Sequence, residues 1–206
     1  MQTFTLQGKA VRLDPLEPHH ADALASASAV DSSLYRWSPV PQGAKAAEKY
    51  IATVIADRDA STAMPFAIVR ITDGAVIGST RFWNIETWAW PEGHPRHNRG
   101  LPDACEIGYT WLTQSAIRTA ANTEAKLLML THAFEVWGVL RVCLHTDARN
   151  VRSQKAIDRV GGKREGILRA HRMAADFTPR DSVRYSILAS EWPGVKARLS
   201  RLLLHP

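Results

Sequence analysis

The sequence predicts one mixed α/β domain built around a central sheet. The best evidence is the segment 105–153, where a β-rich run, a polar turn, a long apolar helix pattern, a second β-rich run and a second helix start follow in order. Two strands joined through a helix of this length form a parallel pair with a right-handed crossover. The chain has 206 residues, 45% of them apolar and 22% charged, so it can bury a core without a disulfide or a metal staple.

In the first half, hydrophobic spacing and turn residues predict a strand, two helices and a hairpin. Val11 and Leu13 alternate with polar residues, as in a half-buried strand. Asp73-Gly74 lies between two β-rich runs and is a strong hairpin signal. The predicted elements are a strand over 9–16, helices over 19–30 and 44–59 with a loop over 31–43 between them, and strands over 66–72 and 75–85.

The second half supplies a buried helix. Residues 122–137 are apolar over most of the helix circumference, which indicates burial against a sheet, and Gly138 is its expected cap. The predicted elements here are strands over 107–112, 139–146, 164–173 and 182–189, helices over 122–137, 150–160 and 191–204, and a polar loop over 176–181. The whole order is β-α-α-β-β-β-α-β-α-β-β-α.

Composition excludes several classes of protein. Cys105 and Cys143 both fall in predicted strands, where reduced core thiols are expected rather than a metal site. The first 13 residues have no long apolar run, and no segment reaches the roughly 20 apolar residues of a membrane span. We therefore expect a cytoplasmic protein without a membrane partner.

The charge is uneven along the chain. Residues 141–201 hold 14 Lys/Arg and 6 Asp/Glu, within a chain of net charge +6. Such a basic half indicates either an anionic partner or simply a solvated basic face. Nucleic acid is an unlikely partner, because the sequence has no compact Lys/Arg run and no recognisable nucleic-acid motif.

The segment 86–103 has no periodicity and is rich in Trp, Pro, His and Arg. A loop of this length is usually functional or mobile, although a surface loop pinned by its aromatic residues is an equally open interpretation. His94 and His97 lack a carboxylate or cysteine at ligand spacing, so we expect no metal there.

The turn 113–122 precedes the buried helix. A helix N-terminus carries free backbone N–H groups and the positive end of the helix dipole, which together favour a phosphate group. This turn is therefore the first candidate for a binding site.

Several short motifs lie in register along the chain. They are NTEAK (122–126), HAFE (132–135), TDARNVRS (146–153), AI (156–157), EGILR (165–169), RD (180–181) and YSI (185–187). In this order they resemble the GNAT superfamily of acyl-CoA N-acetyltransferases, in the branch of the ribosomal-protein N-terminal acetyltransferases (Rim type). The resemblance covers residues 11–204. It implies the α/β GNAT fold, with a mixed, mostly antiparallel twisted sheet of about seven strands, splayed at the acetyl-CoA site and with helices on both faces.

The resemblance also implies where acetyl-CoA binds. The cofactor would lie in the splay, with its pantetheine arm beside residues 111–113 and its pyrophosphate on the turn 115–123. Asn150 would face the arm, and Ser153 would lie near the thioester sulfur. The expected cofactor residues are Trp111, Leu112, Thr113, Arg118, Thr119, Ala120, Ala121, Asn122, Thr123, Asn150 and Ser153.

Three positions depart from the family pattern. Arg118 replaces a phosphate-loop glycine, so we expect an ordinary φ there or a reshaped loop. Its guanidinium could bind a phosphate directly or face solvent. Ile157 stands where many of these enzymes have a tyrosine acid. Arg172 stands where one Rim-type class has a glutamate base.

Amine acetylation needs a group that takes a proton from the amine. Glu106 is the candidate base, because it matches the glutamate base of histone-acetyltransferase relatives; a structural ion pair is its alternative role. Ser153 is the candidate acid, although it and Asn150 could simply cap a helix. His145 and His171 are candidate proton relays. The expected substrate residues are Trp83, Trp88, Trp90 and Tyr109.

The leading functional prediction is an acetyl-CoA-dependent N-acetyltransferase. Its acceptor would be a primary amine, most simply the α-amino group of a protein N-terminus, a peptide or an amino-acid-like compound. The alternatives are a non-catalytic acyl-CoA-binding regulator and a nucleic-acid-associated basic protein. The tryptophans of segment 86–103 would also suit a homodimer contact.

Overall fold

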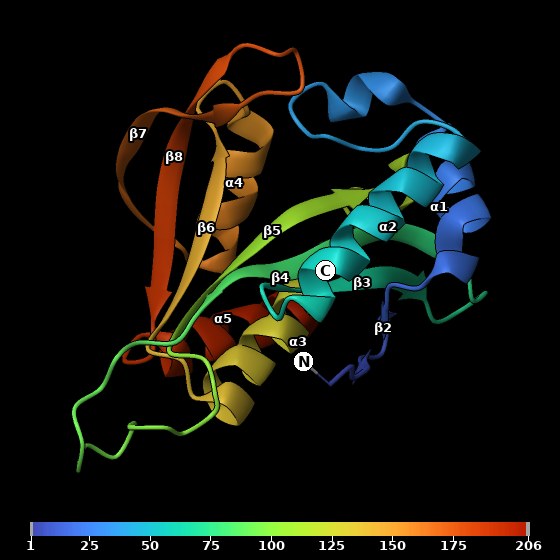
Figure 1. Cartoon of the computed structure of the whole chain (residues 1–206). Coiled ribbons are helices and arrows are strands. Elements are labelled where there is room, and N and C mark those ends of the chain that lie inside the picture. The colour runs from blue at the N-terminus through green and yellow to red at the C-terminus, as the bar shows by residue number, and fades with distance from the viewer. Residues whose placement is uncertain (1, 205–206) are drawn as a thin grey trace.

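In the computed structural model, which describes residues 2–204, the chain forms one eight-stranded sheet in the order β1-β2-β3-β4-β5-β6-β8-β7 (Figure 1). The strands are β1 (Leu6–Gln7), β2 (Val11–Pro15), β3 (Ala63–Arg70), β4 (Val76–Glu86), β5 (Ala104–Leu112), β6 (Arg141–Asp147), β7 (Lys163–Met173) and β8 (Pro179–Leu188). The sequence predicted all of these except β1, whose two residues are too few to show a periodicity.

Five α-helices accompany the sheet, and the sequence predicted each of them. They are α1 (Ala21–Ser28), α2 (Ala44–Asp59), α3 (Ala120–Thr131), α4 (Val151–Val160) and α5 (Trp192–Leu204). Short 3₁₀ helices cover Pro18–His20, Ser32–Tyr35 and Gln114–Ala116, and a π-helical turn, His132–Trp137, continues α3. Helix α3 begins two residues before its predicted start, because the Thr119 side chain accepts a hydrogen bond from the Ala121 N–H and caps it.

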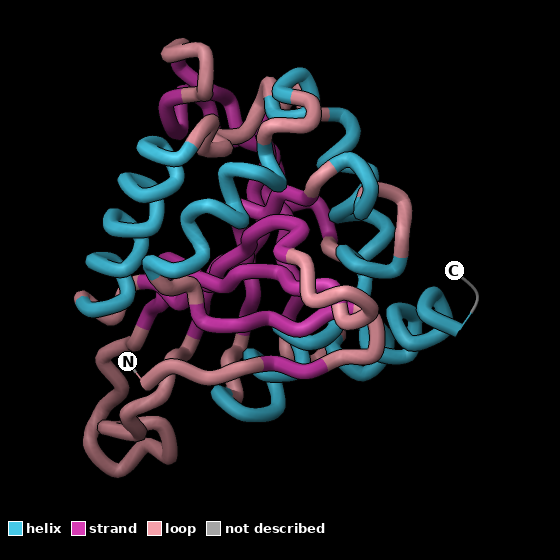
Figure 2. Tube along the Cα trace, turned by 90° about the vertical axis from the view of Figure 1, so that its right-hand side faces the viewer, coloured by secondary structure: helices cyan, strands magenta, loops and turns pink. Residues whose placement is uncertain are grey.

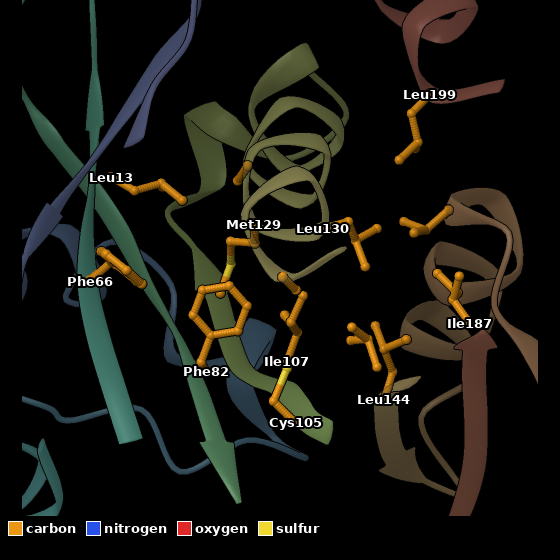
Figure 3. Packing of buried hydrophobic residues seen from close by; sticks show 14 of the residues in the cluster. Leu13, Phe66, Phe82, Cys105, Ile107, Met129, Leu130, Leu144, Ile187 and Leu199 are labelled. Atoms are coloured by element: carbon orange, nitrogen blue, oxygen red, sulfur yellow. The ribbon is translucent and has the colours of Figure 1, made fainter. Parts of the chain in front are cut away.

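Helices cover both faces of the sheet, as predicted (Figure 2). Helices α1 and α2 pack on one face over a core that includes Leu24, Ile51 and Ala67. Helix α3 packs on the other face, where Met129 and Leu130 meet apolar side chains of the strands (Figure 3). No helix within residues 2–204 is long and apolar enough to cross a bilayer.

The sheet is split between β5 and β6. These two strands form the parallel pair, while all the other neighbours are antiparallel. Their pairing covers only residues 104–106 against 141–143, although β5 continues to Leu112 and β6 to Asp147. A bulge at Tyr109, where φ is +52°, shifts the register of β5 against β4 just beyond the split. The predicted splay is therefore present, and it opens after Glu106.

Glu124, the glutamate of the NTEAK motif, fastens α3 to the N-terminal strands. Its buried carboxylate accepts hydrogen bonds from the backbone N–H groups of Lys9, Ala10 and Val11, at 2.8, 2.6 and 2.7 Å. A side chain on Gly8 would meet this carboxyl group, because an added Cβ would lie 2.5 Å from it. The motif residue therefore sets where α3 lies on the sheet.

We expect Glu124→Gln to lower the free energy of unfolding by about 2–3 kcal/mol, since the new amide N–H₂ would face backbone donors in a buried site. Urea denaturation measures this. Glu48→Gln is the matched control. Because Glu48 is exposed on α2, this change should alter the free energy of unfolding by no more than about 0.5 kcal/mol. Equal effects of the two changes would show that the Glu124 contacts do not stabilise the fold.

Candidate active site

A cavity of about 810 Å³ lies at the split, within the size range of small-molecule and cofactor sites. It is lined by residues 106–112 of β5, by Ile117, Arg118, Asn122 and Lys126 at the start of α3, and by residues 144–147 of β6. Helix α4 along its length, the loop around residues 34–40 and the β7–β8 tip close its sides. Beyond Glu106, the edge of β5 that faces β6 has no strand partner.

The turn before α3 keeps a glycine-type conformation without a glycine. Arg118 has φ +63°, in the left-handed region. The expectation of an ordinary φ at Arg118 is therefore wrong, and the arginine carries the strain of this conformation. A reshaped loop stays a prediction. Its exposed side chain lines the cavity and forms no ion pair within the described part of the chain.

The predicted cofactor residues divide into two groups. Trp111, Leu112, Arg118, Asn122, Asn150 and Ser153 line the cavity. Thr113, Thr119, Ala120, Ala121 and Thr123 contribute nothing to its lining. Within the first group, Trp111 packs edge-on against the Tyr35 ring, at 5.6 Å between centroids, and so fixes the strand beside the cavity.

Asn150 caps α4, which was the alternative role that the sequence left open for it. Its side-chain Oδ1 accepts a hydrogen bond from the backbone N–H of Ser153, at 3.0 Å. Both residues also line the cavity. This cap fixes the Asn150 side chain beside the cavity. The Ser153 hydroxyl has no hydrogen bond to any of residues 2–204.

Glu106 lies at the closed end of the split and is 3% exposed. Arg172 Nη2 donates to its Oε2 at 3.2 Å, and His145 Nδ1 lies 3.0 Å from the same oxygen. Burial opposes the charged form, but His145 and Arg172 outweigh it and hold the pKa of Glu106 below its usual range. The carboxylate is therefore ionised at neutral pH.

The structure brings the two histidines named from the sequence together. The rings of His145 and His171 are 5.1 Å apart, and His145 is the one beside Glu106. The sequence singled out Arg172 only because a glutamate is missing there. Its pairing with Glu106 joins residues 66 positions apart, which no local pattern reveals.

Two of the predicted substrate residues form an aromatic cluster beside Glu106. Trp83 and Tyr109 meet edge-on at 5.3 Å. The Arg81 guanidinium lies 3.5 Å from the Tyr109 ring centre, and that of Arg172 lies 4.3 Å from the Trp83 ring centre. Only Tyr109 of this pair lines the cavity.

The other two, Trp88 and Trp90, do not line the cavity. Their loop extends from the end of the sheet where β5 and β6 are paired, away from the open end (Figure 1). Arg96 and Arg99 of the loop bind inward to Asp103, at 3.1 and 3.9 Å. The loop geometry thus gives no support to a substrate role for these tryptophans, which stays a prediction.

No group of three or more His, Cys, Asp or Glu side chains within residues 2–204 is arranged to hold a metal ion. Cys105 and Cys143 are buried free thiols, as expected. The residues missed by the sequence reasoning are Lys126, Arg180 and the loop around residues 34–40, all of which line the cavity.

Comparison with known proteins gives consistent matches. Residues 10–163 match the family model described as an acetyltransferase (GNAT) domain. The chain is 27% identical over 184 residues to Bacillus subtilis YdaF, named as a candidate ribosomal N-acetyltransferase, covering 88% of this chain and 92% of that protein. A candidate acetyltransferase from T. thermophilus is 34% identical, with a TM-score of 0.78 over 98% of this chain and 100% of that one. Mycobacterium smegmatis RimJ, solved with CoA-disulfide, shares the fold at 22% identity and a TM-score of 0.79, over 97% and 95% of the two chains.

We expect Arg118→Gly to raise the free energy of unfolding by about 1 kcal/mol, because glycine adopts the observed φ without a Cβ clash and this gain exceeds its larger unfolded-state entropy. Thermal or urea unfolding measures the change. Arg118→Ala keeps the Cβ and should show no gain. A glycine variant no more stable than the alanine variant would contradict strain at this position.

Proposed function

Because the chain belongs to the GNAT acetyltransferase family, we propose that it is an acetyl-CoA-dependent N-acetyltransferase acting on a primary amine in the cytoplasm. The observation that carries the proposal is the cavity at the split, which joins an unpaired strand edge, a helix N-terminus and a buried carboxylate. Each of these three features suits one part of the reaction.

The unpaired edge of β5 and the start of α3 suit the cofactor. A pantetheine arm carries amide groups, which can pair with free backbone groups as a further strand would. Its diphosphate would lie on the N–H groups at the start of α3, with Arg118 close enough to donate charged hydrogen bonds. RimJ, which shares this fold, was solved in complex with CoA-disulfide.

Glu106 suits the role of base. The amine nitrogen attacks the thioester carbonyl, an N–C bond forms and the C–S bond breaks, and the amine proton passes to the Glu106 carboxylate directly or through water. Since a thiol with a pKa near about 8.5 leaves with little help, the buried Ile157 at the tyrosine position does not prevent turnover. We propose Ser153, which lines the cavity, as the donor to the sulfur.

The acceptor end of the cavity is cationic. Arg172 is neutralised by Glu106, but Arg180, which lies opposite it in the β7–β8 register, forms no ion pair with any of residues 2–204. Burial and the charge of Arg172 lower the pKa of Arg180. Such a wall disfavours a polyamine or an aminoglycoside. We therefore propose an α-amino acceptor on a peptide, a protein N-terminus or an amino-acid-like compound.

Replacing Glu106 by Gln keeps the side-chain shape and removes the base, so we expect kcat to fall by about a hundred- to ten-thousandfold. Thiol release with a good acceptor measures kcat, and calorimetry should show unchanged acetyl-CoA affinity. A fall of less than a few-fold would make Glu106 structural. Tight acetyl-CoA binding without turnover in the wild type would favour the non-catalytic regulator.

The relative rates with different acceptors test whether Arg180 makes the acceptor end of the cavity cationic. Amino acids and N-terminal peptides should be acetylated faster than spermidine or an aminoglycoside. Arg180→Met should slow carboxylate-bearing acceptors by about ten- to a hundredfold in kcat/KM, the effect of one lost charged hydrogen bond.

The matched control is Arg169→Met, which removes an exposed arginine of β7 that does not line the cavity and should change neither rate. Spermidine turned over faster than every amino-acid and peptide acceptor would contradict the proposed acceptor class.

A further inference from the structure

Lys126 is an isolated buried amine on the second turn of α3. Its side chain is 5% exposed, lines the cavity and pairs with no carboxylate within the described residues. Lysines are almost never fully buried unless they are paired. Residues 2–204 therefore supply no counter-ion for this amine, and a ligand in the cavity can offer it a further acceptor.

The hydrogen bonds of Lys126 leave one N–H of its protonated amine without an acceptor. Its Nζ donates to Thr110 Oγ1 at 2.5 Å and to Thr80 Oγ1 at 3.3 Å. The two hydroxyls are themselves 2.8 Å apart, where either can donate, and Thr80 Oγ1 also lies 3.6 Å from Met129 Sδ. A protonated amine has three hydrogens, and the third has no acceptor among residues 2–204.

Burial lowers the pKa of Lys126 to about 7, so at neutral pH the amine gains or loses a proton readily. No charged neighbour fixes its state. Glu124 on α3 is bound to the N-terminal backbone, Arg81 on β4 faces Tyr109, and Glu106 on β5 is held by Arg172. The other charged groups that line the cavity are Arg118 just before α3, His145 and Asp147 on β6, Arg152, Lys155 and Arg159 on α4, Arg172 on β7 and Arg180 on β8.

The neutral and protonated amines present different groups to the cavity. With both hydrogens of the neutral form on the threonines, its lone pair is left over and repels a carbonyl oxygen. The protonated form offers a third N–H instead. Lys126 lies six residues after Ala120, about 9 Å along the helix, so it is nearer to the pantetheine arm than to a diphosphate at the helix start.

We propose that Lys126 binds an amide carbonyl of the pantetheine arm, and that coenzyme A binding loads a proton onto its amine. The inference rests on the proposed function, because it requires coenzyme A in this cavity. It adds a cofactor contact and makes cofactor affinity depend on pH.

The protonation state of the free Lys126 amine sets the direction in which coenzyme A affinity changes with pH. Binding favours the protonated form, so below pH 7 the proton is already present and affinity is highest. Above about pH 7, each binding event must draw a proton from solution, and affinity should fall by up to about tenfold per pH unit until the pKa of the bound form is reached.

Calorimetry of coenzyme A at pH 8, in two buffers with different ionisation enthalpies, measures the proton taken up. The wild type should take up several tenths of a proton to one proton more than Lys126→Met, a comparison that cancels the titration of the phosphate and thiol of coenzyme A itself. Lys155→Met, an exposed lysine across the cavity, should keep the uptake. Between pH 6.5 and 8, coenzyme A affinity should fall more steeply with pH in the wild type than in Lys126→Met.

Equal uptake in the wild type and Lys126→Met would overturn the inference while leaving the proposed function intact. Failure of coenzyme A to bind at all would overturn the proposed function and this inference with it.

Discussion

The rest of the structure depends on the early end of the hydrogen bonds between β5 and β6. Pairing stops at Glu106 and Cys143, although both strands continue. Backbone groups left unpaired at a buried edge need partners, and an open edge invites an added strand. The split therefore both weakens the middle of the sheet and creates a binding edge. A ligand with amide groups of its own can pair with that edge as a further strand would.

Several contacts hold the split open without the ligand. The bulge at Tyr109 turns β5 away from β6, and the Lys126–Thr110–Thr80 hydrogen bonds fasten α3 behind it. Glu124 fixes the same helix to the first strands. Across the cavity, the Arg149 guanidinium lies 4.2 Å from the Trp37 ring centre and joins the loop around residues 34–40 to the turn before α4. The cavity is thus built by contacts remote in sequence.

The sequence predicted most of the elements, because their signals are local. Asp73-Gly74 predicted a hairpin whose Gly74 has φ +70°, and the long apolar pattern predicted α3. The site was predicted less fully. Glu106 was singled out by a family position, but its contacts with His145 on β6 and Arg172 on β7 depend on how these two strands lie beside β5. Lys126 reads locally as an ordinary polar position on a helix, and its burial appears only once Thr80 and Thr110 are beside it. Trp88 and Trp90 were selected by composition, which does not say at which end of the sheet their loop lies.

A crystal structure of the protein with coenzyme A would show whether the split between β5 and β6 is the acetyl-CoA site. If it is, the pantetheine arm should lie along residues 107–112, with main-chain hydrogen bonds to β5, and the diphosphate should lie at the N-terminus of α3. Coenzyme A bound elsewhere, or β5 and β6 paired beyond Glu106 in the complex, would rule this site out.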